Sequence, residues 1–596
     1  MSQTAMEPTS TTTPTEDPHG QAGCPSWQVW SALALVSVVS GWLTLLGIQT
    51  GLPSQERLEI SLGGPEAIDR AEADIRQVLE SKIADRSEFV AAQGKPEMAR
   101  LSPYFDQVRS FHPDEQYILK TLARMARDRD VHPRSYIYGP IFFYQVGAGL
   151  AIAKAVGALP KQTDVLYYLR RPWEFAPMYL NARLMCAAFG VAAVAVTFWI
   201  GYRLGGIELA TVGALLLGCV PLMTLAGKFI KPDTPAVFWS ALALWFALSA
   251  ASKTRWRDYL LSGACVGLAM GSKYPAALAG MYLATFHAAR RWAERKTKPL
   301  PGREDGMLVA AGGAAVLAFV ATNPACVLDA KVFWSDFEFI SRVLRTTSFA
   351  EAVWDGIISY GQDAFLYTMG PAAFLAVLAG VAVAVARPSR VWLGLLPTVA
   401  LFFVFACRGR PGSDAYLLPV FPALALLGAR AMLRISPLSL RWGIVGLVIL
   451  VTLSYSLAYG VTARAENARM IAARWINERV EPGSTIGTAK YPVGYRVPMI
   501  SPERYRLLSA ELDPAARAAD YFLDSSFEWS GATWRDRLVG RAVTGGPPGE
   551  GYRVAATFER VPRALFGLLP LRRDHMLTPY IEVVAPRIVI YEREKG

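Results

Sequence analysis

The sequence predicts a polytopic α-helical membrane protein with about 11 transmembrane helices, followed by a small α/β domain. Of its 596 residues, 53% are hydrophobic and only 18% are charged, which is a low charge content for a soluble protein. Several uninterrupted apolar runs reach the roughly 17–25 residues that span a bilayer. Basic residues gather in short loops between these runs, so the net charge of +12 indicates membrane topology rather than a nucleic-acid partner.

The first third of the chain alternates between polar and apolar segments. Residues 1–26 are rich in Thr, Pro, Ser and Glu, which predicts a disordered cytoplasmic tail. The apolar run 27–48 lacks a preceding basic segment, so we expect a retained transmembrane helix. Residues 50–180 then form a large outer loop. Because 27–48 leads out and 181–202 must lead back in, the apolar segment 141–159 is expected to lie at the outer surface or to re-enter.

The loop charges set the predicted orientation. Basic loops near Lys253, Arg290, Arg387 and Arg434 are expected to be cytoplasmic, as is the N-terminus. Residues 462–596 return to a soluble composition and predict an extracytoplasmic α/β domain, with a helix at 470–480 and a final strand at 588–591. With no eukaryotic sorting signal, an inner (plasma) membrane is expected. The remaining spans are predicted at about 181–202, 208–227, 235–252, 258–273, 275–290, 306–323, 369–387, 391–407, 415–433 and 441–461, which together with 27–48 make the transmembrane domain 27–461.

Two adjacent carboxylates, Asp114 and Glu115, stand at the start of a predicted amphipathic helix in the outer loop. Pro113 suits the first position of that helix, and the apolar residues that follow recur at helical spacing, as in a helix that lies on a membrane surface. A carboxylate at a helix N-terminus stays ionised, as a general base must. For Glu115, helix capping and catalysis are equally good interpretations, whereas its surroundings favour a catalytic role for Asp114.

Basic residues on the predicted outer side are the second candidate group. A single cation at a helix end usually only reaches toward the interface. Several of them beside two carboxylates indicate a site for an anionic headgroup, with positive charge where a phosphate leaves. These residues are Arg183, Lys228, Lys231 and Lys273.

Further candidates flank these cations. Asp233 is expected to cap the helix that follows it and can also orient a lysine or the substrate. In the last outer loop, Arg408, Arg410 and Tyr416 are more simply a polar connector, with a second contact to phosphate or sugar as the alternative. His112 and His132 match no trusted metal motif, so we expect no metal and no cofactor. The six cysteines are expected to be small buried hydrophobic residues, and a disulfide between Cys326 and Cys407 is the alternative.

Six short motifs in order resemble the GT-C glycosyltransferases, specifically the group that contains the protein O-mannosyltransferases and the bacterial lipid A aminoarabinose transferase. The resemblance covers roughly residues 27–433. It implies a polyprenyl-phosphate-linked sugar donor that is used on the outer face without a nucleotide. The motifs are His112-Pro113-Asp114-Glu115, Tyr138-Gly139-Pro140, Asn181-Ala182-Arg183-Leu184, Lys231-Pro232-Asp233-Thr234-Pro235, Gly271-Ser272-Lys273 and Tyr416-Leu417-Leu418-Pro419.

By this resemblance, Asp114 activates the acceptor with support from Glu115, and Arg183 contacts the donor phosphate. Tyr138 stands where some members of the group carry a Lys-Pro-Pro, and the loop before Asp114 is unusually long. The expected partners are the lipid-linked donor, membrane lipid and an acceptor glycan, glycolipid or protein. The expected reaction is inverting transfer to an acceptor hydroxyl.

Two other functions compete with this hypothesis. A lipid or sugar transporter should carry polar residues along a path through the middle of the membrane, whereas the polar residues here gather at the outer ends of the helices. A non-catalytic scaffold of the cell envelope would leave the outer cluster of charges unexplained.

Overall fold

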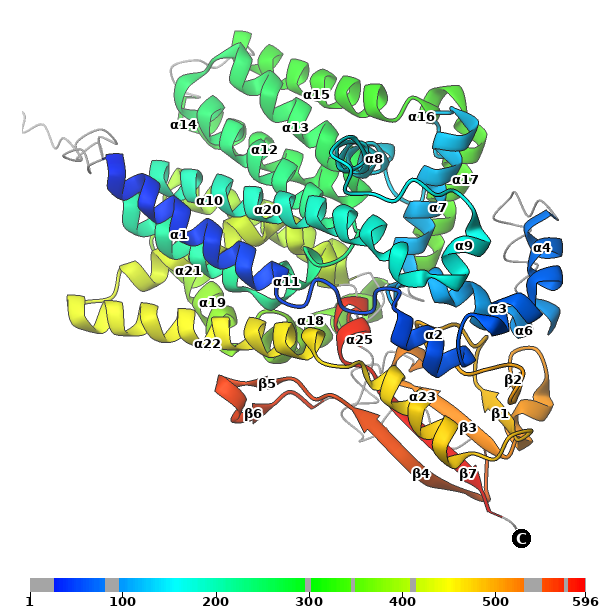
Figure 1. Ribbon diagram of the computed structural model, residues 1–596. Coiled ribbons are helices and arrows are strands. Elements are labelled where there is room, and N and C mark those ends of the chain that lie inside the picture. The colour runs from blue at the N-terminus through cyan, green and yellow to red at the C-terminus, as the bar shows by residue number, and fades with distance from the viewer. Residues whose placement is uncertain are drawn as a thin grey trace, which may run out of the picture.

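The computed structural model describes residues 26–80, 96–294, 302–344, 349–407, 414–529, 549–572 and 577–594. A bundle of long helices forms one part of the molecule, and a strand-containing domain packs at one end of it (Figure 1). This confirms the predicted helical membrane fold with a small C-terminal strand domain. Within the described ranges, six helices are long and apolar enough to cross a membrane, so the predicted number of 11 is not confirmed. These six contain α1 (Ser26–Leu45), α10 (Ala176–Cys219), α12 (Asp233–Lys253), α15 (Arg303–Thr322), α20 (Arg390–Cys407) and α22 (Leu438–Arg464).

The other predicted spans are also helical but shorter. They correspond to α13 (Trp256–Ser272), α14 (Gly280–Glu294), α19 (Pro371–Ala386) and α21 (Phe421–Leu433). α19 and α21 each carry a proline in the first turn, a position where the missing N–H costs no helical hydrogen bond. The five cysteines within the described ranges are all free, so the Cys326–Cys407 bridge does not form.

α10 is two antiparallel helices joined at a glycine pair. Gly205 and Gly206 leave the helical conformation, and Gly206 has φ +74°, which favours glycine. A Cβ on Gly201 would lie only 2.8 Å from the Ala210 Cα, an approach that a continuous helix cannot make. The two predicted segments 181–202 and 208–227 thus share a sharp reversal, and α11 (Pro221–Ala226) follows the second of them.

The loops predicted to be outside and the loops predicted to be cytoplasmic lie at opposite ends of the bundle. α1 ends, α12 begins and α13 ends at the side that faces the strand domain. At the other end, Arg203 contacts the last turns of α12 through Ser249 and Ser252. His287 lies 3.0 Å from Asp305 at that same end, where the basic loops predicted to be cytoplasmic lie. This separation of loops brings the predicted outer residues together.

The large outer loop folds into short helices that cover the end of the bundle where α1 ends and α12 begins. They are α2 (Gln55–Leu62), α3 (Glu66–Arg70), α4 (Glu72–Glu80), α6 (Pro96–Phe105), α7 (Pro113–Asp128), α8 (Pro140–Ala155) and α9 (Val165–Arg170). Figure 1 shows α8 end-on, whereas α12 and α13 run across the view. Gly147 of α8 packs on Leu122 of α7. α8 therefore runs across the direction of α12 and α13, and the expectation that segment 141–159 lies at the outer surface or re-enters stays a prediction.

The C-terminal domain is built on a five-stranded sheet with the order β2-β1-β3-β7-β4. β1 is parallel to β2 and β3, whereas β7 runs antiparallel to β3 and β4. α23 (Ala468–Arg479) contributes Ala473 and Ile476 to its core. The helix and final strand predicted in this region are both present. The strands are β1 (Thr485–Thr488), β2 (Arg506–Ser509), β3 (Tyr521–Ser525), β4 (Tyr552–Glu559) and β7 (Arg587–Arg593).

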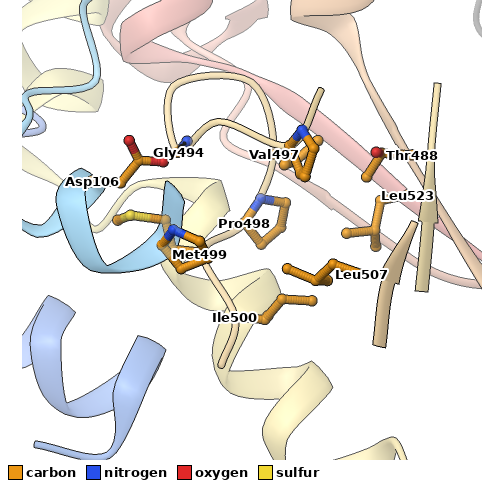
Figure 2. Close-up of a pocket in the computed structure, with 11 residues that line it drawn as sticks. Asp106, Thr488, Gly494, Val497, Pro498, Met499, Ile500, Leu507 and Leu523 are labelled. Atoms are coloured by element: carbon orange, nitrogen blue, oxygen red, sulfur yellow. Dashed lines mark hydrogen bonds between the residues drawn. The ribbon is translucent and has the colours of Figure 1, made fainter. Parts of the chain in front are cut away.

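The C-terminal domain is fixed to the outer loop and to the bundle. The Gly494 N–H donates to Asp106 Oδ2 at 2.7 Å, beside a small pocket lined mostly by apolar side chains (Figure 2). Between β4 and β7 the chain makes two excursions toward the bundle. One is the hairpin of β5 (Arg563–Ala564) and β6 (Leu569–Pro570), and the other is α25 (Pro579–Val584).

Candidate functional site

Asp114 lies in the first turn of α7, where local sequence holds it. Pro113 occupies the first turn, and the His112 Nδ1 caps the helix by accepting a hydrogen bond from the Asp114 N–H at 3.3 Å. The Lys231 Nζ lies 2.8 Å from the Asp114 Oδ2, and a third of the Asp114 side chain stays exposed. Burial alone would raise the pKa of Asp114, but the Lys231 ammonium outweighs it and, with a hydrogen bond from Tyr138, lowers the pKa to about 2.

Glu115 points away from Asp114 into a fully buried ion pair. The Arg183 Nε and Nη2 donate to its two oxygens at 2.8 and 2.6 Å, and both side chains are 0% exposed. The Ile230 N–H also donates to Glu115 Oε1. Arg183 Nη1 donates to the carbonyls of Ile48 and Thr50, at the end of the first transmembrane segment. Arg183 therefore joins α7 and α10 to the chain beyond α1.

A further ion pair, between Asp233 and Lys273, lies near Asp114. Asp233 begins α12; its Oδ1 pairs with the Lys273 Nζ, and its Oδ2 accepts a hydrogen bond from the Tyr580 hydroxyl at 2.6 Å. Lys273 also donates to the Ala415 carbonyl and lies 4.3 Å from the centre of the Tyr416 ring. The Lys231 Nζ lies 5.7 Å from the Tyr580 ring centre, between the two carboxylates.

Asp114, Lys231, Asp233 and Lys273 thus form one connected cluster, which we term the charge network. Aromatic rings enclose it: the ring centres of Tyr138 and Tyr580 lie 5.6 and 5.7 Å from the Lys231 Nζ, and Tyr416 lies beside Lys273. A cation over an aromatic face is stabilised, and the same faces offer flat apolar surfaces to a sugar ring.

Lys228 lies apart from the charge network. Its ammonium is fully buried and donates to the carbonyls of Leu43 and Thr44 at 2.5 and 2.9 Å, in the last turn of α1. Burial lowers the pKa of Lys228 to about 7. Like Arg183, Lys228 joins the end of α1 to the rest of the bundle. Arg408 and Arg410, also predicted to contact substrate, lie outside the described residues.

Two glycine motifs fix the spacing between Tyr138 and Lys273. A Cβ on Gly139 would lie 1.7 Å from the Gly271 carbonyl oxygen, so only glycine permits this approach of the two backbones. Tyr138 precedes one glycine and Lys273 follows the other by two residues. The sequence motifs around them therefore lie side by side because their backbones are in contact.

Tyr580 is the residue that the sequence analysis missed. It comes from α25 of the C-terminal domain, is 2% exposed, and stacks on Phe229 with ring centres 5.8 Å apart. It also lies 5.8 Å from the ring of His112, whose pKa burial lowers to about 4. The Thr578-Pro579 start of α25 indicates a helix, but nothing in the sequence distinguishes Tyr580 from the other 23 of the 24 tyrosines.

Comparison with known proteins supports the predicted resemblance. Residues 178–311 match the family model described as dolichyl-phosphate-mannose-protein mannosyltransferase, a stretch that includes Arg183, Lys231, Asp233 and Lys273. The match confirms the resemblance to the GT-C glycosyltransferases predicted from the motifs. No curated protein matches the chain.

Several solved structures are similar to this chain at low sequence identity. ArnT from Cupriavidus metallidurans, bound to undecaprenyl phosphate, is 13% identical, with a TM-score of 0.41; the match covers 85% of this chain and 98% of that one. The Archaeoglobus fulgidus oligosaccharyltransferase, tethered with an acceptor peptide, is 14% identical, with a TM-score of 0.43, over 81% of this chain and 64% of that one.

The low pKa of Asp114 predicts a pH profile. Because its pKa is lower than the ordinary value of 3.8, the stabilisation from its ion pair is complete above about pH 4–5 and is lost only as the pH falls through about 2. We expect the activity of the protein to show no acid limb from Asp114 between pH 5 and 8. Initial rates measured across this range check the prediction, and an essential group titrating near pH 6 would contradict it.

Proposed function

We propose that the protein is a membrane glycosyltransferase that moves a sugar from a polyprenyl-phosphate donor to a hydroxyl of an acceptor. The observation that carries the proposal is Asp114, an ionised and partly exposed carboxylate held beside Lys231 in a cluster that also contains Lys273. The matched family model is named for dolichyl phosphate mannose, and this name supports a lipid-linked donor.

In this mechanism the donor phosphate binds Lys231 and Lys273. The acceptor hydroxyl gives its proton to Asp114 and attacks the anomeric carbon from the face opposite the phosphate. The bond between that carbon and the phosphate oxygen breaks, so polyprenyl phosphate leaves and the configuration at the anomeric carbon is inverted. The lysines stabilise the charge on the leaving group.

Donor binding also prepares the base. In the empty site the Lys231 ammonium depresses the pKa of Asp114. A phosphate that takes over Lys231 withdraws this cation, so the pKa of Asp114 rises toward its ordinary value. A carboxylate with a higher pKa is a stronger base, so Asp114 becomes more reactive once the donor is bound.

The remaining predicted residues receive supporting roles. Glu115 and Arg183 position the start of α7, so a direct contact of Arg183 with phosphate would require it to release Glu115 or a carbonyl. Asp233 orients Lys273, and Lys228 holds α1. Tyr138 and Tyr416 line the sugar position. Arg408 and Arg410 stay proposed contacts to phosphate or sugar.

We further propose that the charge network opens to the extracytoplasmic side of a bacterial inner membrane. The basic loops at the opposite end of the bundle support this orientation. The C-terminal domain then lies outside the cytoplasm, and the acceptor reaches Asp114 from the same side.

The test uses purified protein in nanodiscs and a panel of polyprenyl-phosphate sugars. Release of polyprenyl phosphate is followed for each donor, with and without a hydroxyl acceptor, and donor binding is measured separately. We expect one donor class to be consumed. Donor binding without release, together with movement of the intact lipid across a vesicle membrane, would instead favour a transporter.

Tyr580→Phe tests the part played by the C-terminal domain. The change removes a hydrogen bond to the charged Asp233, and such bonds contribute roughly 1.5–3 kcal/mol. We expect kcat/KM to fall about 10-fold or more, together with a loss of thermal stability, because the bond is buried. Tyr521→Phe is the matched control, because the Tyr521 hydroxyl donates to Glu592 in the sheet at 3.2 Å, and this variant should keep its activity. Equal losses in both variants would contradict a role for Tyr580 in the site.

A further inference from the structure

The β5–β6 hairpin carries a concentrated patch of exposed apolar side chains. Phe566 is 73% exposed, Leu568 is 84% exposed and Leu569 is 38% exposed. The chain turns through three residues of positive φ, Leu565, Phe566 and Gly567, so these side chains project from a tight tip. Large apolar groups so exposed at a loop tip mark a contact surface rather than ordinary surface variation.

The opposite side of the hairpin packs on a membrane helix. Ala564 and Leu571 are buried in the same apolar core as Tyr455 of α22, and the Leu565 N–H donates to the Ser454 Oγ at 3.1 Å. Figure 1 shows the hairpin leaving the sheet and running beside α22. The hairpin therefore has one face fixed against α22 and one apolar face without a described partner.

The position of Ser454 on α22 gives the depth of the tip. Ser454 precedes Arg464, the last residue of α22, by about ten residues, or about 15 Å along a helix. α22 is one of the helices apolar enough to cross a membrane. Nearby on it, Leu447 and Leu450 are 61% and 52% exposed. At this level the medium around a spanning helix is the hydrocarbon of the bilayer, which is about 30 Å thick in total.

Basic residues mark the base of the hairpin. Arg560 and Arg572 are exposed and stand before and after the apolar tip. Arg563 is also exposed but lies nearer the tip, where its Nη1 donates to the Gly567 carbonyl at 3.5 Å. Apolar side chains at a tip with basic residues behind them are typical of segments that sit in a lipid leaflet and contact its phosphate groups.

We propose that residues 560–572 form a lipid-embedded finger, with Phe566, Leu568 and Leu569 among acyl chains and with Arg560 and Arg572 at the headgroup level. The finger fixes the C-terminal domain to the membrane beside α22. Since α25 follows it in the chain, this attachment holds Tyr580 over the charge network. The inference depends on the depth of the hairpin and not on the proposed reaction.

Site-directed spin labelling in vesicles of neutral and anionic phospholipid tests the proposal. A nitroxide is attached at Leu568→Cys, at Arg560→Cys and at the control Val554→Cys, an exposed position on β4 (58%) of the same domain. Labelled wild-type protein supplies the background from the native cysteines. Collisions with oxygen report lipid exposure, and collisions with a water-soluble nickel complex report water exposure.

We expect position 568 to be accessible to oxygen and shielded from nickel, position 554 to show the reverse, and position 560 to lie between them. High nickel accessibility at 568 would place the hairpin in water and overturn the proposal. Shielding of 568 from both reagents would also overturn it, because it would show that protein, such as a second copy of the chain, covers the tip.

Discussion

Asp114→Asn is expected to lower the rate of sugar transfer by about 10²–10⁴-fold, the usual contribution of a general base. The amide keeps the size of the side chain and the start of α7, but it cannot accept a proton from a hydroxyl. Because Lys231 loses its ion pair with Asp114, donor binding should be retained or strengthened. The expected result is therefore a loss in kcat without a rise in KM, measured as release of polyprenyl phosphate.

Asp128→Asn is the control for this variant. Asp128 ends the same helix and makes an exposed ion pair with Arg127, so its change should leave the rate unaltered. Full activity of Asp114→Asn would exclude Asp114 as the base. A donor that no longer binds would show that Asp114 shapes the site instead.

Removing either partner of the Glu115–Arg183 pair is expected to have the largest effect on stability. Both side chains are fully buried, so Glu115→Gln or Arg183→Met leaves the other charge without its counter-ion, at a cost of about 3–5 kcal/mol. Equilibrium unfolding in mixed micelles measures this free energy. The double variant Glu115→Met/Arg183→Met removes both charges and should recover part of the loss. Recovery should remain incomplete, because the Ile230 N–H and the Ile48 and Thr50 carbonyls lose their partners.

Arg553→Met provides the comparison for an exposed ion pair. Arg553 contacts Glu592 at 2.8 Å, with 66% of its side chain exposed, and such pairs contribute at most about 1 kcal/mol. If Arg183→Met costs no more than Arg553→Met, the buried pair is not what joins α7 to α10.

Local features of the fold were predictable because short sequence patterns determine them. Pro113 and the residues after it start α7 as predicted, and the apolar runs form helices close to the predicted bounds. The reversal at Gly205 and Gly206 also falls between two predicted spans. Each of these features depends on residues that are close in sequence, so periodicity and helix-capping preferences suffice to locate them.

The partners of the charged residues were not predictable in the same way. Lys231 contacts Asp114 across 117 positions, and Tyr580 reaches Asp233 across 347. Sequence patterns indicate that such residues lie near one end of the bundle, but tertiary packing decides which side chains meet. Arg183 shows the limit of this reasoning: the sequence places it at the start of an outer helix but does not indicate its buried partner Glu115. Its contact with donor phosphate stays a prediction.

The charge network contains two carboxylates and two ammonium groups, so its charges cancel when no substrate is present. A neutral cluster has almost no long-range field and does not draw anions from bulk solution. A soluble phosphate compound would have to separate two ion pairs, and only its own charge would offset the free energy lost from them. A donor anchored in the bilayer starts at a high local concentration and gains further binding free energy from its prenyl chain. In the proposed reaction, charge cancellation therefore favours membrane-confined phosphates over dissolved ones.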